Sequence, residues 1–419
     1  MSEKTKGLEA MTEKTSRASG EEAAHPSTSA VASNAPVILS NEAGSFAWGV
    51  LAKRHPALIQ QVRDAFPYGP RQHEALDALL DEITNGAVEP LAPAERDHER
   101  WAVSGQEYFG RSWYDAPFLW AESYFYRRLL GAVGYFGTGP WQGVDPFAPF
   151  KKAELGGDAV EEELRALDAL ANVPAEERAT ALLHASLWGN RADLGFRVVA
   201  GEPEAGDSAA PALVADDSVL LWQLLPVGTG STVAVVADNA GRELIPDLIL
   251  IDHLLEQRHA DRVVLHVKHD PYYVSDAMTA DVVDCLRRLI EAPGEASRIG
   301  GRLWKAMAAG NLGVRTHPFF CAPQPYGEMP EDLRGEFESA ALTILKGDLN
   351  YRRLVGDQLW DATASFADLT TYFPGAVAAL RTLKSDVIVG LEEGTLDALE
   401  RSGDAWRTSG THALIQVRQ

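Results

Sequence analysis

The C-terminal half of the chain alternates between short apolar runs and longer segments of helical character, and this alternation constrains its fold most strongly. Five runs are typical of buried strands, namely residues 219–225, 232–237, 263–267, 341–345 and 377–383. Between them, residues 244–257 and 280–291 are typical of helices. Strands that alternate with helices form a mostly parallel sheet with helices on both faces. The sequence therefore predicts an α/β fold.

The N-terminal part of the chain has a different character. Residues 1–35 are rich in Ser, Glu, Lys, Thr and Ala without apolar periodicity, which predicts a disordered tail. Residues 36–180 predict a helical N-terminal domain, so that residues 181–419 form the α/β domain. Within the second domain, residues 201–217 are typical of an exposed acidic insertion.

One helix of the N-terminal domain is expected over residues 117–131, with Pro in its first turn and Gly at its end. It is apolar on nearly all sides, which predicts burial. Its charged residues Glu122, Arg127 and Arg128 have two interpretations. Internal salt bridges between helices are the favoured one, and a contribution to an anion site is the alternative.

The charge of the chain limits its partners. It has 419 residues, with 60 Asp and Glu against 38 Lys and Arg, and a formal net charge of −22. Such a field repels phosphate backbones and anionic lipids, so neither nucleic acid nor membrane is expected as a partner. The N-terminus lacks the apolar segment of a secretory signal, so we expect a cytoplasmic protein. Cys285 and Cys321 lack metal-like spacing, and we expect buried thiols.

Asp238 and Asn239 directly follow the strand predicted at 232–237. Ligands of open α/β sheets bind at the carboxyl ends of strands. Carboxylate and amide oxygens at that edge suit a hard cation such as Mg²⁺ or Mn²⁺. The alternative is an ordinary turn, since Asp-Asn-x-Gly is common turn chemistry.

Asp276 follows the next predicted strand, and we expect it at the same edge of the sheet. Two carboxylates and one amide leave room for water and a phosphate oxygen, as Mg²⁺-type sites prefer. Asp270 is the competing ligand because it lies nearer to the strand end. His269 and His266 are weaker candidates, since a lone His in a strand usually has a structural role.

Two later strand ends carry cations. Lys346 and Gly347 precede a predicted helix that contains Asp348 and Asn350. A helix N-terminus with a nearby Lys is an anion site, and Gly permits close backbone approach; an N-cap followed by a salt-bridged helix is the alternative. Lys384 follows the last predicted strand and could bind a phosphoryl group as a point charge; the alternative is a solvated side chain, which is usual for a lone Lys at a strand end.

Together these segments resemble the metal-dependent damage-control phosphatases, in the subfamily of acidic residue (protein-glutamate) methyltransferase-like proteins. The matching segments are residues 187–190, 238–243, 247–248, 274–276, 346–352 and 381–384. The resemblance extends from about Phe46 to the C-terminus. It implies a helical N-terminal domain on a three-layer α/β/α domain, and hydrolysis of small phosphorylated metabolites such as fructose 1-phosphate with Mn²⁺, Mg²⁺, Co²⁺ or Ni²⁺.

The resemblance also implies roles for individual residues. Asp238, Asn239 and Asp276 would be the metal ligands, and Asp238, Asn239 and Lys384 the catalytic residues. The expected substrate-binding residues are Asp348, Leu349, Asn350, Tyr351, Arg352, Lys384, Asn190 and Glu122. In this mechanism Lys384 stabilises charge on the phosphoryl oxygens, and Asp348 and Asn350 orient sugar hydroxyls. Two other functions stay open: adenosylmethionine-dependent methylation of protein glutamate, and metal-dependent lyase or cyclase chemistry on a secondary metabolite.

Overall fold

The computed structural model describes residues 35–170, 173–189 and 212–419. Its strands are β1 (Ala212–Asp216), β2 (Thr232–Val236), β3 (Arg262–Val267), β4 (Leu312–Thr316), β5 (Leu342–Lys346), β6 (Val377–Thr382) and β7 (His412–Arg418). They form a seven-stranded sheet in the order β1-β7-β6-β5-β2-β3-β4. The pairs from β6 through β4 are all parallel, β7 pairs antiparallel with β6, and β1 pairs parallel with β7, so β1 and β7 run opposite to the other five strands. The expectation of a mostly parallel sheet is confirmed.

The helices fall into groups along the chain. The first group is α1 (Phe46–Gly49), α2 (His55–Ala65), α3 (Pro70–Asn85), α4 (His98–Gly105) and α5 (Phe118–Val133). Next come α6 (Ala148–Leu155), α7 (Asp158–Leu170), α8 (Ala175–Trp188), α10 (Ser218–Gln223), α11 (Leu244–Glu256), α12 (Thr279–Glu291) and α13 (Glu295–Ala309). The last are α14 (Glu331–Ser339), α15 (Gly347–Val355), α16 (Phe366–Leu369) and α17 (Glu393–Ser402). None of the helices in the described ranges is long and apolar enough to span a membrane.

Two hydrophobic cores lie on the two faces of the sheet. In β2, Val233 and Val235 point into one core, which also contains residues of α7, α8 and α11 to α13. Ala234 and Val236 point into the other, which includes α14, α15 and the buried faces of α1 to α5. Strand side chains alternate between faces, so a strand covered on both sides is apolar throughout. The three-layer α/β/α arrangement is thereby confirmed.

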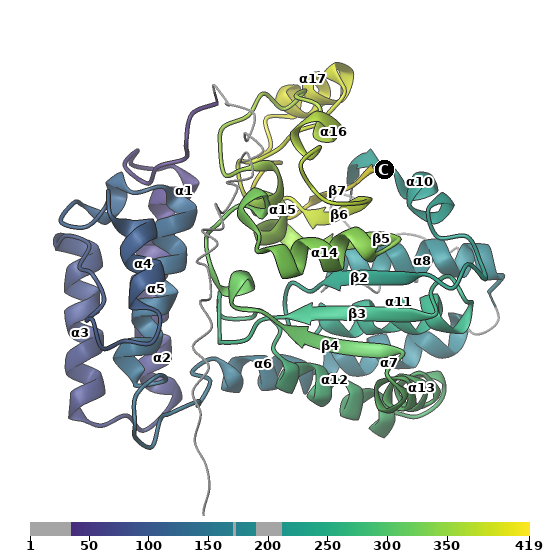
Figure 1. Cartoon of the computed structure of the whole chain (residues 1–419), viewed down its shortest axis with the longest axis horizontal. Coiled ribbons are helices and arrows are strands. Elements are labelled where there is room, and N and C mark those ends of the chain that lie inside the picture. Colours follow the sequence, from purple (N-terminus) through teal and green to yellow (C-terminus); the bar gives the residue numbers. More distant parts are fainter. Residues whose placement is uncertain (1–34, 171–172, 190–211) are drawn as a thin grey trace, which may run out of the picture.

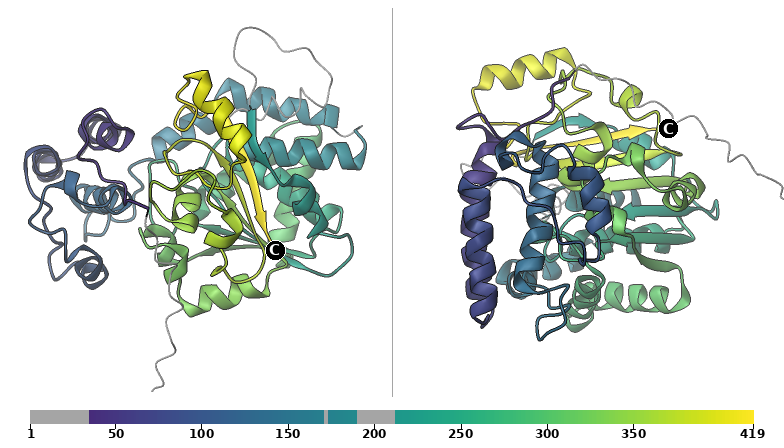
Figure 2. Two further views of the ribbon diagram at one scale, coloured as in Figure 1. Left: turned by 90° about the horizontal axis from the view of Figure 1, so that it is seen from above. Right: turned by 60° about the vertical axis from the view of Figure 1, so that its left-hand side comes forward.

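Helices α1 to α5 form a separate group beside the sheet, at the edge toward which the arrows of β2, β3 and β4 point (Figure 1). The view from above shows the same separation between this group and the layered part (left-hand view of Figure 2). Helices α7 and α8 pack with the layered part, since their buried residues belong to the core of the sheet. The domain boundary between residues 180 and 181 stays a prediction, and the expected tail lies almost wholly outside the described residues.

Four predicted strands are present as β2, β3, β5 and β6, and the helices expected at 117–131, 244–257 and 280–291 are α5, α11 and α12. The strand expected at 219–225 is wrong, because this segment forms α10. In α10, Leu221 is buried while Val219 is 70% exposed. An apolar run this short does not show whether its apolar residues follow the spacing of a helix or that of a strand. The acidic insertion expected at 201–217 also needs correction: residues 201–211 lie outside the described ranges, but Ala212–Asp216 is strand β1.

Candidate active site

The carboxyl ends of β5, β2 and β3 meet at the edge of the sheet that faces α1 to α5 (Figure 1). Strand β2 has β3, the next strand of the chain, as its neighbour on one side. On its other side β2 pairs with β5. The order of the strands therefore reverses between β2 and β5. Loops diverge at such a switch point and leave a crevice for a ligand.

Asp238 and Gly347 face each other across this switch point. Asp238 follows β2, and Gly347 begins α15 directly after β5. A Cβ added at Gly347 would lie 1.9 Å from Asp238 Oδ2, and the backbone φ of Gly347 is +83°. Both facts require Gly. We expected Gly347 to permit the close approach of a ligand, and in the structure the carboxylate of Asp238 takes that position; an approach of a ligand stays a prediction.

Main-chain pairing brings Asp276 to Asn239. The two residues form an antiparallel bridge, and Ala277 N donates to Asp238 O at 2.9 Å. Ser275 Oγ donates to Asn239 Oδ1 at 2.7 Å. The structure thus brings the three predicted metal ligands together on two neighbouring loops.

The loop before Asp276 has a strained backbone. Tyr273 and Val274 have φ values of 46° and 65°, and positive φ is costly for a β-branched residue such as Val274. Helix α5 supports this loop: Tyr126 stacks on Tyr273 with ring centroids 4.8 Å apart, and the hydroxyls of Ser123 and Tyr273 lie 3.3 Å apart. The helical group therefore fixes the conformation of the loop that carries Asp276.

Negative charge is concentrated in this crevice. Burial raises the pKa of Asp238 well above its usual range, and the carboxylates of Glu243 and Asp276 raise it further. Burial also raises the pKa of Asp276 to about 6, against the opposing charge of Lys268. Lys268 Nζ lies 3.3 Å from Asp276 Oδ2. The fold therefore gathers buried carboxylates that repel one another.

The donor set fits a divalent cation. Asp276 Oδ2 is buried with Lys268 Nζ as its ion-pair partner at 3.3 Å, and the carboxylate of Asp238 lies against Gly347, where any side chain would displace it. In the part of the chain that the structure describes, no three His, Cys, Asp or Glu side chains form a metal cluster by themselves. A cation here therefore needs the amide oxygen of Asn239 as well as the two carboxylates, and oxygen donors of this kind are those that Mg²⁺ and Mn²⁺ prefer.

Lys384 lies on the exposed side of the crevice. Its Nζ is 3.6 Å from Glu243 Oε1, and 44% of its side chain is exposed. Partial burial lowers the pKa of Lys384, but Glu243, Asp238 and Asp348 together raise it above its usual value. Glu243 in turn accepts from Asn239 Nδ2 at 3.0 Å. A charged Lys384 is thus held at the mouth of the crevice, next to the predicted metal ligands.

The predicted substrate-binding residues of α15 differ in their surroundings. Asp348 accepts from Arg381 Nε at 2.8 Å and from Ser385 Oγ at 3.0 Å, and 17% of its side chain is exposed. Asn350 is buried, and its Nδ2 donates to the carbonyl of Ala237 at 3.2 Å, directly before Asp238. Asp348 therefore remains accessible at the edge, whereas Asn350 contacts the main chain beneath Asp238.

The remaining predicted substrate ligands are buried against protein groups. Arg352 Nη1 donates to Glu122 Oε2 at 3.1 Å, and Arg352 Nε donates to Asp357 Oδ1 at 2.7 Å. Leu349 is buried, and Tyr351 OH donates to Gln416 Oε1 at 2.9 Å. Asn190 lies outside the described residues. Substrate contacts by these residues stay a prediction, and the salt bridge of Glu122 joins α5 to α15.

The alternative ligands are occupied elsewhere. Arg96 Nη2 donates to Asp270 Oδ2 at 2.6 Å, and His269 Nδ1 lies 2.8 Å from the same oxygen. His266 is buried, and its Nε2 lies 3.5 Å from Glu336 Oε1. The favoured internal salt bridges of α5 are also present, because Arg127 pairs with Glu95 and Asp97 and Arg128 pairs with Glu82.

Sequence reasoning missed two buried lysine clusters beside the site. Lys151 of α6 donates to Asp145 Oδ2, to Asp281 Oδ2 and to the main-chain oxygen of Asp276, at 2.9 to 3.0 Å. Lys346 Nζ, which we expected to serve an anion site, is buried 2.8 Å from Asp247 Oδ1 and from Ser186 Oγ. No sequence pattern around Lys151 predicts its cluster. The Lys346 cluster could have been found, because its partner Asp247 lies in one of the segments that resemble the family.

The fold and this crevice define an α/β protein with an acidic, cation-compatible site at the switch point of its sheet. Residues 50–399 match the model of the damage-control phosphatase ARMT1-like domain, so the chain belongs to this family. The chain is 30% identical to damage-control phosphatase ARMT1 of Mus musculus, with 91% of this chain and 98% of that protein covered. It is 29% identical to the protein of the same name from Danio rerio, with 89% and 94% covered. A crystal structure of a DUF89 family protein from Pyrococcus horikoshii matches with 14% identity and a TM-score of 0.47, over 84% of this chain and 93% of that one.

Proposed function

We propose that this protein is a metal-dependent phosphatase of small phosphorylated metabolites, with sugar phosphates such as fructose 1-phosphate as its substrate class. The observation that carries the proposal is the convergence of Asp238, Asn239 and Asp276 beside a charged Lys384. The curated relatives are named damage-control phosphatases, which supports the same reaction.

Asp238, Asn239 and Asp276 would hold the cation, which is Mn²⁺, Mg²⁺, Co²⁺ or Ni²⁺ in this proposal. When bound, such a cation polarises a phosphoryl oxygen and lowers the pKa of a water molecule. Lys384 supplies a second positive charge for the phosphoryl oxygens, which carry spread negative charge in the transition state. Glu243 keeps the ammonium group of Lys384 near the crevice, since Glu243 Oε1 lies 3.6 Å from Lys384 Nζ.

Asp348 would orient a hydroxyl of the sugar. Its carboxylate is fixed by Arg381 and Ser385, so a hydroxyl that donates to it meets an acceptor with little freedom to move. Positioning of this kind contributes to the rate because the reacting groups no longer have to find their orientation. Asn350 contributes indirectly, because it holds the main chain just before Asp238.

The experiment is phosphate release from a panel of phosphorylated sugars, by protein treated with a chelator and then given each of the four cations. We expect release only after a cation is added back. Methyl transfer from adenosylmethionine without phosphate release would support the methyltransferase instead. Turnover restricted to unphosphorylated compounds would support a lyase or cyclase.

A further inference from the structure

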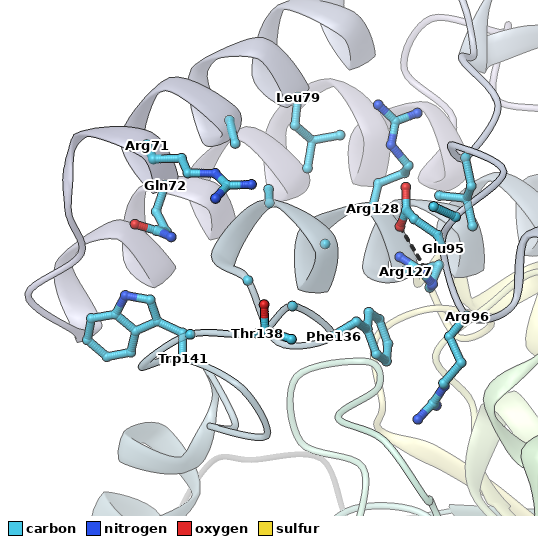
Figure 3. A pocket seen from close by; sticks show the side chains of 18 of the residues that line it. Arg71, Gln72, Leu79, Glu95, Arg96, Arg127, Arg128, Phe136, Thr138 and Trp141 are labelled. Carbon is cyan, nitrogen blue, oxygen red and sulfur yellow. Dashed lines mark hydrogen bonds and ion pairs between the residues drawn. The ribbon is translucent and has the colours of Figure 1, made fainter.

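A second cleft lies in the helical group, apart from the crevice at the sheet edge (Figure 3). It has a volume of about 850 Å³, and its walls are α3, α5, residues 91–96 and the loop 134–141. None of the predicted metal-binding or substrate-binding residues lines it. It is therefore a separate cavity.

The lining of this cleft is cationic, in contrast to the chain as a whole. Four arginines line it, namely Arg71, Arg96, Arg127 and Arg128, together with a single carboxylate, Glu95. The whole chain has 60 Asp and Glu against 38 Lys and Arg. In a protein that repels anions over most of its surface, a local group of arginines determines where an anion can bind.

Three of these arginines have carboxylate partners. Arg128 is paired with Glu82, Arg96 with Asp270, and Arg127 with Glu95 and Asp97. These pairs fix the guanidinium groups in place and neutralise part of their charge. The capacity of the cleft for an anion therefore depends on the donors that remain without acceptors.

Several donors do remain. Arg71 is exposed and has no ion pair or side-chain hydrogen bond within the described ranges, and its side chain extends over the cleft from α3 (Figure 3). The adjacent Gln72 lines the same wall. On the α5 wall Arg127 is only 5% exposed, and its Nη1 has no hydrogen-bond partner among the described residues. A buried donor without an acceptor is unfavourable, and an oxygen from a ligand would relieve it.

Gly131 opens the approach to this buried donor. It is exposed on the cleft wall, and a Cβ at this position would lie 3.3 Å from Arg127 Nη1. Phe136 lies on the other side, with its ring 4.2 Å from the guanidinium carbon of Arg127. The donor therefore has an apolar ring on one side and an open glycine on the other.

The rest of the surface is apolar and aromatic. Ala75, Leu79 and Ala132 cover the helical walls, and Trp141 lies at the end opposite Phe136 (Figure 3). Small side chains leave room for the body of a ligand, and aromatic rings favour contact with a flat or apolar group.

We propose that this cleft binds a small organic phosphate, whose phosphoryl group binds Arg71 at the Trp141 end and whose apolar or ring-shaped body extends along the cleft toward Phe136 and Arg127 (Figure 3). Arg provides the planar fork that binds phosphate in two-point contacts, and a free Arg71 has its whole fork available. This binding needs neither the metal ligands nor Lys384, so it is independent of the proposed phosphatase activity.

The test is isothermal titration calorimetry of the full chain with phenylphosphonate, which has a phosphoryl group, a ring and no bond that a phosphatase cleaves. The chelator-treated Lys384→Ala protein is used, so that anion binding at the sheet edge is weakened. We expect one binding event, at least tenfold weaker after Arg71→Ala and unchanged after Arg287→Ala, which removes an exposed arginine of α12. Methylphosphonate, which lacks the ring, should bind severalfold more weakly than phenylphosphonate.

Arg71 is exposed and unpartnered, so the Arg71→Ala protein should keep the melting temperature of its parent, and a loss of binding then reports on the cleft itself. Gly131→Leu is the second variant, because its side chain would fill the approach to Arg127 Nη1 from an exposed position. It should also weaken binding at least tenfold. Absence of saturable binding, or equal affinity in the parent and both cleft variants, would overturn the proposal.

Discussion

Lys151 Nζ donates to the main-chain oxygen of Asp276 at 3.0 Å and so joins α6 to the loop of a predicted metal ligand. Burial opposes the charge of Lys151, but Asp145 and Asp281 raise its pKa above the usual value, so it stays protonated. Lys151→Met should therefore weaken Mn²⁺ binding by roughly tenfold or more, the scale seen when a group behind a metal ligand is lost. Calorimetric titration of the chelator-treated protein with Mn²⁺ measures this.

The matched control is Lys152→Met, at the exposed neighbouring position of the same helix. It should leave both Mn²⁺ affinity and melting temperature unchanged. Lys151→Met also leaves Asp145 and Asp281 without their shared cation, so its melting temperature should fall. An Mn²⁺ affinity equal to that of the parent in the folded Lys151→Met protein would show that Lys151 serves stability alone.

Gly347→Ala tests the contact between α15 and Asp238. The added Cβ would occupy the position of the Asp238 carboxylate and displace it. Metal-dependent activity should therefore fall by roughly a hundredfold, as it does when an enzyme loses one group that stabilises the charge of the transition state. Gly356→Ala is the control at the other end of the same helix. Its φ is +92°, but a Cβ there would lie 3.6 Å from Trp360, an ordinary contact. Both variants should lose about 1–3 kcal/mol of stability from backbone strain, and equal loss of activity in both would contradict the specific role of Gly347.

Lys384→Ala tests the second positive charge of the site. If Lys384 contacts the phosphoryl group, its removal should lower kcat/KM by about a hundredfold or more. Lys384→Arg should recover only part of the activity, because a planar fork does not replace a point charge. Mn²⁺ affinity without substrate should stay the same or rise, since a nearby cation opposes metal binding. Full activity of Lys384→Ala with saturating Mn²⁺ would exclude this contact.

His55 predicts how stability depends on pH. It is buried and stacked on Phe125 with ring centroids 3.8 Å apart, and burial, with a smaller effect of Arg54, lowers its pKa to about 3. The folded state therefore binds fewer protons than the unfolded state between pH 6.5 and about 3, and stability falls as pH falls through this window. From pH 6.5 to pH 5 the loss is about 1.6 kcal/mol.

Urea unfolding at the two pH values, for the parent and for His55→Leu, measures this contribution. The His55→Leu protein should lose less stability than the parent over the same interval, because the leucine takes up no proton. An identical loss in both proteins would show that His55 does not carry the acid sensitivity.

The strands that the sequence predicts correctly are those covered on both faces. β2, β3, β5 and β6 lie between two helix layers, so nearly all of their residues are apolar and the runs are easily recognised. β4 lies at the edge of the sheet, and its only fully buried residue is Leu312, so its pattern resembles a loop. The segment that forms α10 is equally apolar but too short to show a helical period.

The sequence also predicts which strand ends carry the site, because the strands are parallel and their carboxyl ends share one edge. Asp238, Asp276, Gly347 and Lys384 all follow such ends. Contacts from α5 and α6 have no comparable signal: Lys151 lies 125 positions before Asp276, and Glu122 lies 230 positions before Arg352. Such pairs depend on how these helices pack against the loops of the sheet, which no local pattern encodes.

The most direct test of the proposed site is phosphate release from fructose 1-phosphate across an Mn²⁺ titration, by the parent protein and by Asp276→Asn and Asp270→Asn. The two carboxylates lie on the same loop, but Asp270 pairs with Arg96, whereas Asp276 bridges to Asn239. We predict that Asp276→Asn loses activity by roughly a hundredfold or more and binds Mn²⁺ more weakly, because a two-carboxylate site loses half its charge. Asp270→Asn should stay within a few-fold of the parent. Loss of activity in Asp270→Asn with full activity in Asp276→Asn would contradict this site, and a parent that releases no phosphate from any sugar phosphate would contradict the proposed function.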